Sequence, residues 1–307
     1  MKNHIITFFI LLTAISSIIA KPSENKLKHS FMVLISQKQS EPEKVEEALS
    51  KLIDGGETTV RFMICYFDRE YPPIRDAIEQ VIIIIGKEAL EPLTEVLAHP
   101  NETESSFAAY LLGEIGSKSS GVPLILAAQS QSSKLRYSAL GALGNCADIN
   151  ALPVLIDALD DDLPSIRRQA AISLGEIGSN RAVESLIPLF SDSNVFVRYS
   201  ASYAIANIGD NSVIDILMRR FESDSIDIIE KSHIIETIGM FASEESLPLL
   251  FDLLEDPSYL NRGFACQALG YYRGNYKVAN ALKQSQTDAS GFVRMMAGKS
   301  LANIGNR

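Results

Sequence analysis

The sequence predicts an all-α protein, an α-solenoid of about eight two-helix repeats, on three observations. One short pattern recurs along the chain, as IRRQAAISLGEIG at 166–178, VRYSASYAIANIG at 197–209 and VRMMAGKSLANIG at 293–305. Its copies end at intervals of 30 to 33 residues, at Gly86, Gly116, Ala147, Gly178, Gly209, Ala242, Arg273 and Gly305. Within each copy, apolar residues recur every three or four positions, which is the spacing of one helix face. Repetition at this period is typical of a solenoid.

The first twenty residues are expected to be a cleaved signal peptide. Lys2 and His4 precede an uncharged run over 5–19, and Ala20 stands just before Lys21. This is the order of a basic region, an apolar region and a small residue at the cut. The run is too short and too rich in hydroxyl residues for a membrane span. We therefore expect a secreted or periplasmic protein, with no stable membrane span in the mature chain.

Three segments follow the signal peptide. Residues 21–40 read as a lysine-bearing linker or N-terminal cap. Residues 41–86 read as a degenerate first repeat, because Arg75 and Gly86 keep the spacing while a double glycine and a double proline flank an insertion. Residues 87–305 hold seven full repeats.

The third full repeat illustrates the expected local structure. Leu152, Leu155 and Leu159 fall on one face of a first helix, which the acidic run 160–162 ends. Pro164 suits the first turn of a second helix, where its missing N–H costs nothing. Gly178 then takes the C-terminal cap position. One such pair cannot bury both apolar faces, so neighbouring pairs must stack.

The motif VR-x2-A-x3-LG-x-IG, found over about residues 87–305, resembles the HEAT-like repeat family in the short form named after phycobilisome lyases. The resemblance implies two antiparallel helices per repeat and a curved superhelix that commonly binds other proteins. It is specific for the fold and says little about function.

A basic residue occupies one slot near the start of most second helices, and an acid stands six positions earlier in four repeats. The arginines are Arg75, Arg136, Arg167, Arg198, Arg262 and Arg294, and the acids are Asp161, Asp192, Asp256 and Asp288. A row of arginines could bind phosphate or carboxylate ligands. We favour a structural ladder, in which the aspartate caps the second helix and the arginine pairs with that acid or with its copy in the next repeat.

A second stripe of the second helices carries tyrosine, methionine and arginine among small polar groups. The partner-binding residues that we predict on it are Tyr110, Tyr137, Arg168, Ile172, Tyr199, Tyr203, Asn207 and Tyr271. An exposed helix face with no binding role would hold Glu, Lys and Gln along this stripe. The observed composition is instead typical of recognition surfaces. Alternatively, the rings pack against the adjacent repeat or under a turn.

Sites for catalysis, metals or cofactors are not apparent in the sequence, and we predict none. Cys65, Cys146 and Cys266 are too few and too far apart for a disulfide framework. No zinc-protease, nucleophile-elbow, Walker or dinucleotide motif is present. The formal net charge of −10 argues against nucleic acid and against anionic lipid as partners. The sequon at Asn101 matters only if the source glycosylates its exported proteins.

Three functions remain open. The favoured one is a non-enzymatic scaffold, exported from the cytoplasm, that binds a partner polypeptide on the concave face of the solenoid. The resemblance also implies, as an alternative, an enzyme or enzyme partner of the bilin-attachment type. A third possibility is a structural module that forms a homodimer through its apolar last repeat, which includes Phe292, Met295 and Met296.

Overall fold

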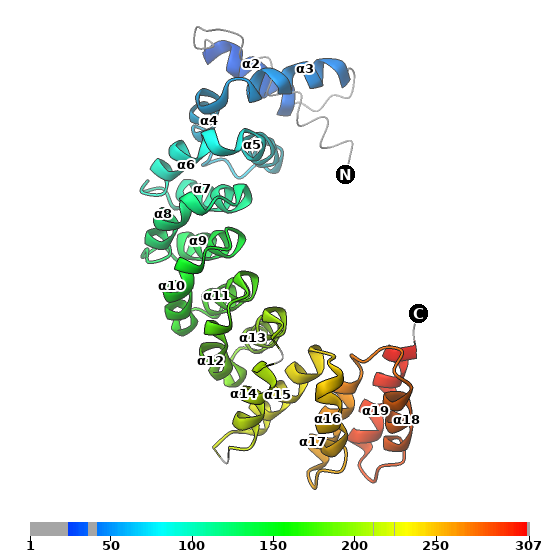
Figure 1. Cartoon of the computed structure of the whole chain (residues 1–307). Coiled ribbons are helices and arrows are strands. Elements are labelled where there is room, and N and C mark those ends of the chain that lie inside the picture. Colours follow the sequence, from blue (N-terminus) through cyan, green and yellow to red (C-terminus); the bar gives the residue numbers. More distant parts are fainter. Residues whose placement is uncertain (1–23, 36–41, 211, 224, 306–307) are drawn as a thin grey trace. The chain divides into compact units, whose positions relative to one another are not determined.

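The computed structural model describes residues 24–35, 42–210, 212–223 and 225–305, and the predicted all-α class is confirmed (Figure 1). The expected signal peptide, with its cut after Ala20, lies outside these residues. The chain divides into two compact units, here called unit 1 (residues 1–154) and unit 2 (residues 155–307). Each unit is described separately below.

Unit 1 contains the degenerate repeat and the first full repeats. Its helices are α2 (Glu24–Ile35), α3 (Pro42–Ile53), α4 (Gly56–Ile64), α5 (Pro72–Ile85), α6 (Leu90–Val96), α7 (Glu102–Ile115), α8 (Gly121–Ala127) and α9 (Ser133–Asn145). Short 3-10 turns precede three first helices, at η1 (Gly86–Ala89), η2 (Lys118–Ser120) and η3 (Ile149–Ala151). The division from unit 2 falls within α10 (Leu152–Asp157).

Unit 2 repeats the same order of a short first helix and a longer second helix. Its elements are η4 (Ala158–Asp160), α11 (Pro164–Ile177), η5 (Asn180–Ala182), α12 (Val183–Leu186), η6 (Ile187–Ser191), α13 (Val195–Ile208), α14 (Ser212–Phe221), α15 (Ile228–Met240), η7 (Glu244–Ser246), α16 (Leu247–Leu253), α17 (Tyr259–Leu269), α18 (Tyr276–Ser285) and α19 (Gly291–Gly305).

Helix α2 belongs to the segment expected to be a linker or cap. Its Leu27, Phe31 and Leu34 are buried, and the helix packs on α3, α4 and α5. The apolar residues at spacings of three and four explain this packing, because they place one side chain per turn on the same helix face.

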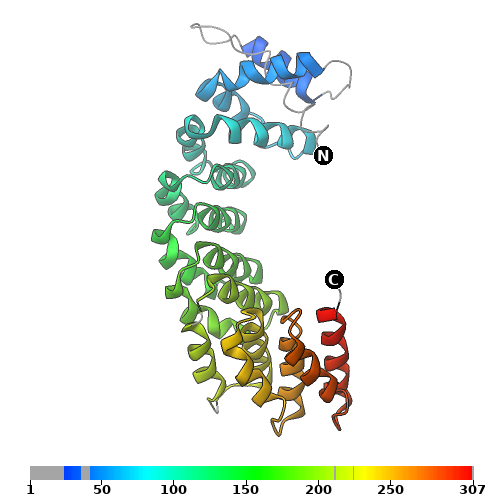
Figure 2. The ribbon, with the colours of Figure 1, turned by 45° about the vertical axis from the view of Figure 1, so that its right-hand side comes forward.

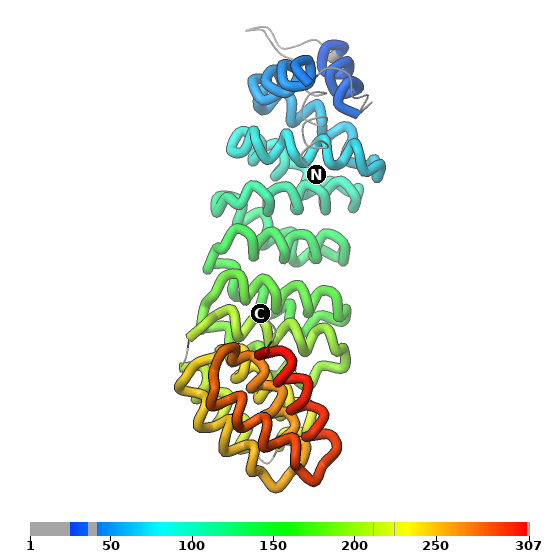
Figure 3. The backbone as a smooth tube through the Cα atoms, turned by 90° about the vertical axis from the view of Figure 1, so that its right-hand side faces the viewer, coloured from blue at the N-terminus to red at the C-terminus, as the bar shows by residue number. Residues whose placement is uncertain are grey.

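The second helices of each unit stack on one another. In unit 1, α7 packs on α9, and in unit 2, α11 packs on α13, α15 on α17, and α17 on α19. Figure 2 shows α5, α7 and α9 of unit 1 side by side with similar axes, and Figure 3 shows them as successive rows. Their apolar stripes supply the core of each unit. Leu174, Ile205, Ile238 and Leu269 of unit 2 are fully buried.

The residue that closes most repeats ends the second helix with a positive φ. Gly178 has φ 70° and caps α11 by donating its N–H to the carbonyl of Leu174. The same slot has positive φ at Gly86, Gly116 and Gly209, and also at Ala147 and Ala242. Glycine adopts this conformation without steric cost, which explains its recurrence at the 31-residue interval. At the end of α17 the left-handed residue is Gly274, one position later than the expected Arg273.

A second glycine in the motif lets neighbouring second helices approach closely. A Cβ added to Gly175 would lie 2.7 Å from the Cα of Ala204 on α13. Gly239 stands against Ala268 on α17 in the same way, at 2.7 Å from its Cα. Glycine facing alanine is therefore a packing requirement of the stack, because backbone atoms cannot move aside as flexible side chains can.

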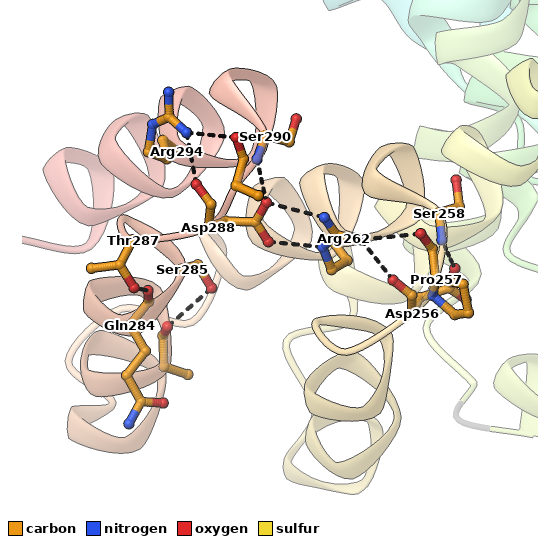
Figure 4. A network of polar contacts seen from close by, with 12 residues as sticks. Asp256, Pro257, Ser258, Arg262, Gln284, Ser285, Thr287, Asp288, Ser290 and Arg294 are labelled. Atoms are coloured by element: carbon orange, nitrogen blue, oxygen red, sulfur yellow. Dashed lines mark hydrogen bonds and ion pairs between the residues drawn. The ribbon is translucent and has the colours of Figure 1, made fainter.

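Arg167 and Arg262 each join the turn of their own repeat to the next repeat. Arg262 donates to the carbonyls of Asp256 and Pro257 at 2.9 and 3.2 Å. Its other nitrogens donate to both carboxylate oxygens of Asp288 in the following repeat, at 2.8 and 3.0 Å (Figure 4). Arg167 binds Asp192 with the same two-pronged geometry, at 2.7 and 2.9 Å. Such pairs fix both distance and orientation between neighbours.

Two arginines meet a different group where the following repeat lacks the aspartate. Arg198 donates to the carbonyl of Asp192 at 2.7 Å and to Nε2 of His233 at 3.3 Å. Arg75 donates to the carbonyl of Phe67, and its guanidinium lies 4.2 Å from the ring centroid of Phe107. Phe107 and His233 occupy equivalent positions of their second helices. The arginine position is thus kept while its partner changes from a carboxylate to a ring.

The two remaining arginines bind the carbonyls of their own turns. Arg136 donates to the carbonyls of Ser130 and Gln131, and Arg294 donates to those of Asp288 and Ala289. The contact with the repeat's own turn is therefore common to the whole set.

The expected helix-capping role of the aspartates is wrong in its detail. Asp192 accepts from the N–H of Asn194 at 2.7 Å, and Asn194 in turn caps α13 by accepting from the N–H of Phe196. Asp161, Asp256 and Asp288 likewise accept from the N–H two residues later. Each aspartate stands two residues before the cap residue. Its short side chain therefore reaches the backbone N–H of the cap residue and not those of the first helical turn.

Candidate protein-binding surface

In unit 1, the predicted tyrosines lie on the exposed side of the second helices. Tyr110 on α7 donates its hydroxyl to Glu79 on α5 at 2.6 Å. Tyr137 on α9 is 45% exposed. Asn145, at the end of α9, donates to Glu114 on α7 at 3.3 Å. Hydroxyl and amide donors of one second helix therefore contact glutamates of the second helix before it.

In unit 2, three predicted tyrosines lie near one another, and one of them contacts Glu236. Tyr203 on α13 is 57% exposed, Tyr199 on the same helix 40%, and Tyr271 just beyond α17 37%. The hydroxyl of Tyr271 donates to Glu236 on α15 at 3.4 Å. Burial raises the pKa of Tyr271, and so do the charge of Glu236 and the neighbouring hydroxyls of Tyr203 and Tyr199. We call Tyr199, Tyr203, His233, Glu236, Gln267 and Tyr271 the tyrosine–glutamate cluster.

Glu236 is the carboxylate of this cluster, and its side chain is 12% exposed. It accepts from Nε2 of Gln267 at 3.0 Å, in addition to Tyr271. Burial raises the pKa of Glu236 and outweighs the two hydrogen bonds, which lower it. The carboxylate is thus held by neutral donors and keeps an electrostatic cost of burial.

His233 is the buried base of the cluster. Its Nε2 accepts from Arg198, which requires an unprotonated nitrogen and places the ring hydrogen on Nδ1. Nδ1 faces Ser202 at 3.3 Å and Glu236 at 3.8 Å, and the edge of the ring meets Tyr199 with centroids 5.2 Å apart. Burial lowers the pKa of His233 to about 4, with a further contribution from the Arg198 charge. The ring is therefore neutral at pH 7.

Ser202, His233 and Glu236 are the residue types of a hydrolase triad, but their geometry differs from one. A triad histidine uses one nitrogen for the serine and the other for the acid. Here both Ser202 and Glu236 face Nδ1, Nε2 is taken by Arg198, and Ser202 is fully buried. The arrangement supports packing rather than nucleophilic catalysis.

The other predicted surface residues of unit 2 lie outside the cluster's contacts. Arg168 on α11 and Asn207 at the end of α13 are exposed, and Ile172 is half-buried. At the last helix, Met295 is 47% exposed, while the ring of Phe292 packs edge-on against Tyr259 and Phe264. Self-association through α19 stays a prediction.

Glu236 and Gln267 lie on the same predicted stripe of the second helices, but neither they nor His233 were among the residues predicted to bind a partner. Glu236 and Gln267 stand 31 residues apart in the same column of the repeat, and that interval could have indicated their contact. The same interval joins Ser202 to His233, whereas Arg198 reaches His233 across 35 residues.

The described ranges hold neither a candidate metal site nor a helix that could cross a membrane. Within 24–35, 42–210, 212–223 and 225–305, no three His, Cys, Asp or Glu side chains gather as a metal site would require. In that part of the chain, no helix has the length and apolarity needed to cross a bilayer. Cys146 and Cys266 are buried free thiols, and Cys65 is exposed.

Comparison with known proteins identifies the repeat. The family model for HEAT repeats matches residues 90–174, 121–194, 152–232 and 227–302. No protein of curated function matches the sequence.

Solved structures with a similar chain include the karyopherin Kap121p bound to the SUMO protease Ulp1p, with TM-score 0.50 and 16% identity over 92% of this chain and 36% of that one. They also include the CpcE–CpcF phycocyanin lyase complex of Nostoc sp. PCC7120, with TM-score 0.42 and 21% identity over 71% of this chain and 88% of that one. Human deoxyhypusine hydroxylase has TM-score 0.36 and 17% identity, over 81% and 96%. At these identities the likeness concerns the fold alone, and it decides nothing about bilin attachment.

Proposed function

Because this chain belongs to the HEAT repeat family, a fold that commonly serves as a protein-interaction scaffold, we propose that it is a non-enzymatic scaffold that binds a partner polypeptide on the exposed face of its second helices. We further propose that it acts outside the cytoplasm, on the strength of the signal-like residues 1–20. Mass spectrometry of the protein from the source envelope tests export, with a chain that begins at Lys21 as the expected result. A chain that retains Met1 in the cytosol would contradict it.

The observation that carries the binding proposal is the exposure of three neighbouring tyrosines, Tyr199, Tyr203 and Tyr271, of which Tyr271 contacts Glu236. Tyrosine offers a large rigid contact surface with a polar end, and it is enriched where binding energy concentrates. These rings stay partly open to solvent, although Tyr199 and Tyr203 lie on α13, whose opposite face is buried, and Tyr271 stands in the turn after α17. This arrangement favours recognition over simple packing.

Affinity capture from the source envelope tests the proposal, with residues 21–307 as bait. We compare the wild type with the Tyr199→Ala/Tyr203→Ala variant and with Tyr276→Ala. Tyr276 is a matched control, because it is 72% exposed but begins α18, a first helix. The expected result is a protein retained by the wild type and by Tyr276→Ala, and lost by the double variant. Retention by the folded double variant would exclude this face as the binding site.

A further inference from the structure

The charge on Glu236 has no cationic partner among the described residues. Its hydrogen-bond donors, Gln267 and Tyr271, are neutral. His233 is neutral as well, because Arg198 donates to its Nε2. An enclosed carboxylate that is hydrogen-bonded but not neutralised still attracts a cation, since neutral donors do not cancel its field.

Two cationic side chains of the described residues lie near the cluster, and neither forms an ion pair with Glu236. Arg198 binds the carbonyl of Asp192 and the ring of His233. Lys299 lines an adjacent cavity of about 420 Å³, shared with Gln267, Tyr271 and Met296, and within residues 225–305 it forms no ion pair with Glu236. The cavity leaves open space beside the donors of the carboxylate.

The tyrosine rings add a second attraction of the same sign. The face of an aromatic ring is electronegative, and it attracts a Lys or Arg side chain placed over it, more strongly when the cation is desolvated. Tyr271 contacts the carboxylate, and the partly exposed rings of Tyr199 and Tyr203 lie near the Tyr271 hydroxyl. The same combination recurs independently in unit 1, where Tyr110 donates to Glu79, beside Asp76 and Glu114.

We propose that the tyrosine–glutamate cluster receives a lysine or arginine side chain of the partner polypeptide, with Glu236 as the counter-charge and Tyr199, Tyr203 and Tyr271 as the aromatic walls. The inference rests on the proposed scaffold function and specifies the chemistry of its partner. The formal charge of −10 favours the approach of such a partner by long-range attraction.

Fluorescence anisotropy with three labelled peptides of equal length tests the proposal on the intact mature chain. One peptide alternates lysine with serine, the second glutamate with serine, and the third threonine with serine. We expect binding of the lysine peptide alone. Glu236→Gln should weaken it about tenfold, equivalent to about 1.4 kcal/mol. Glu184→Gln, an exposed acid on the first helix α12, should leave affinity unchanged.

Two variants of the Tyr203 ring separate cation recognition from nonspecific hydrophobic binding. Tyr203→Phe keeps the aromatic face and should retain binding, whereas Tyr203→Leu keeps an apolar side chain and should lose several-fold in affinity. Equal binding of the three peptides, no binding of the lysine peptide, or equal effects of Glu236→Gln and Glu184→Gln would overturn the inference. If a captured partner is lost by the Tyr199/Tyr203 variant but bound normally by Glu236→Gln, the scaffold function stands and only the cation site fails.

Discussion

The arginine ladder and the tyrosine–glutamate cluster are two polar regions of the same second helices in unit 2, and they treat charge in opposite ways. In the ladder, the guanidinium of Arg167 meets the carboxylate of Asp192 with two hydrogen bonds. In the cluster, Glu236 meets only an amide, a hydroxyl and a neutral ring. Both regions link one repeat to the next.

The difference separates structural charge from charge that is available for binding. A carboxylate that is already paired with a guanidinium is neutralised and attracts a further cation only weakly. A carboxylate held by neutral donors fixes the neighbouring repeat and keeps its field. Two polar regions at the same interval in the sequence can therefore have different functions, and the partner of each charge decides which.

The largest expected effect comes from breaking the ladder at its charged pair. Arg167→Ala leaves the Asp192 side chain, 7% exposed, without its cation, and should lower the free energy of unfolding by about 3 kcal/mol. Arg198→Ala leaves the neutral ring of His233 and the carbonyl of Asp192 without their donor. It should lower the free energy of unfolding by only about 1 kcal/mol. Urea unfolding followed by circular dichroism measures both. Equal losses for the two variants would remove the distinction between charged and neutral partners.

The pH dependence of stability gives the next effect. The folded His233 has a pKa of about 4, lower than the ordinary value of 6.5. Below pH 6.5 the unfolded chain therefore binds a proton that the folded chain excludes. Stability should fall by about 3 kcal/mol as the pH drops from 6.5 to 4. Glu236 acts in the opposite sense, because its pKa is raised and the folded form takes up its proton first.

Urea midpoints between pH 7 and pH 4.5 test this dependence, with His233→Gln as the comparison. The variant should lose distinctly less stability than the wild type over this range. Asp192 does not interfere, because its lowered pKa gives a contribution to stability that is complete above the ordinary 3.8 and is lost only as the pH falls from there through the lowered pKa. Parallel pH profiles for the two proteins would show that the ring is not held neutral.

The smallest effect is expected from neutralising the cluster itself. Glu236→Gln keeps an oxygen that can accept from Gln267, so stability should change by less than about 1 kcal/mol. The matched substitution Asp192→Asn removes a charge-assisted pair and should cost about 2 kcal/mol. Differential scanning calorimetry of both variants provides the comparison. A loss for Glu236→Gln as large as that for Asp192→Asn would assign Glu236 to the structural class.

The repeat interval was enough to predict the stack, because each of its signals is local. Gly178 ends a helix in the left-handed conformation wherever it stands, and Pro164 starts one. The stripe of the second helix that holds Tyr199 and Tyr203 was likewise recognisable from helical spacing. The neutrality of His233 was not visible, because it depends on the approach of Arg198 from another repeat.

The sequence by itself therefore determined the helices, their interval and the face on which tyrosine gathers, since helical periodicity and turn chemistry act over a few residues. Only the tertiary structure decided which charges are neutralised. Asp192 and Glu236 are both acids that contact a neighbouring repeat, and no local pattern indicates that one meets Arg167 and the other Gln267. That choice depends on side chains 25 to 35 residues apart, which are brought together when the repeats stack.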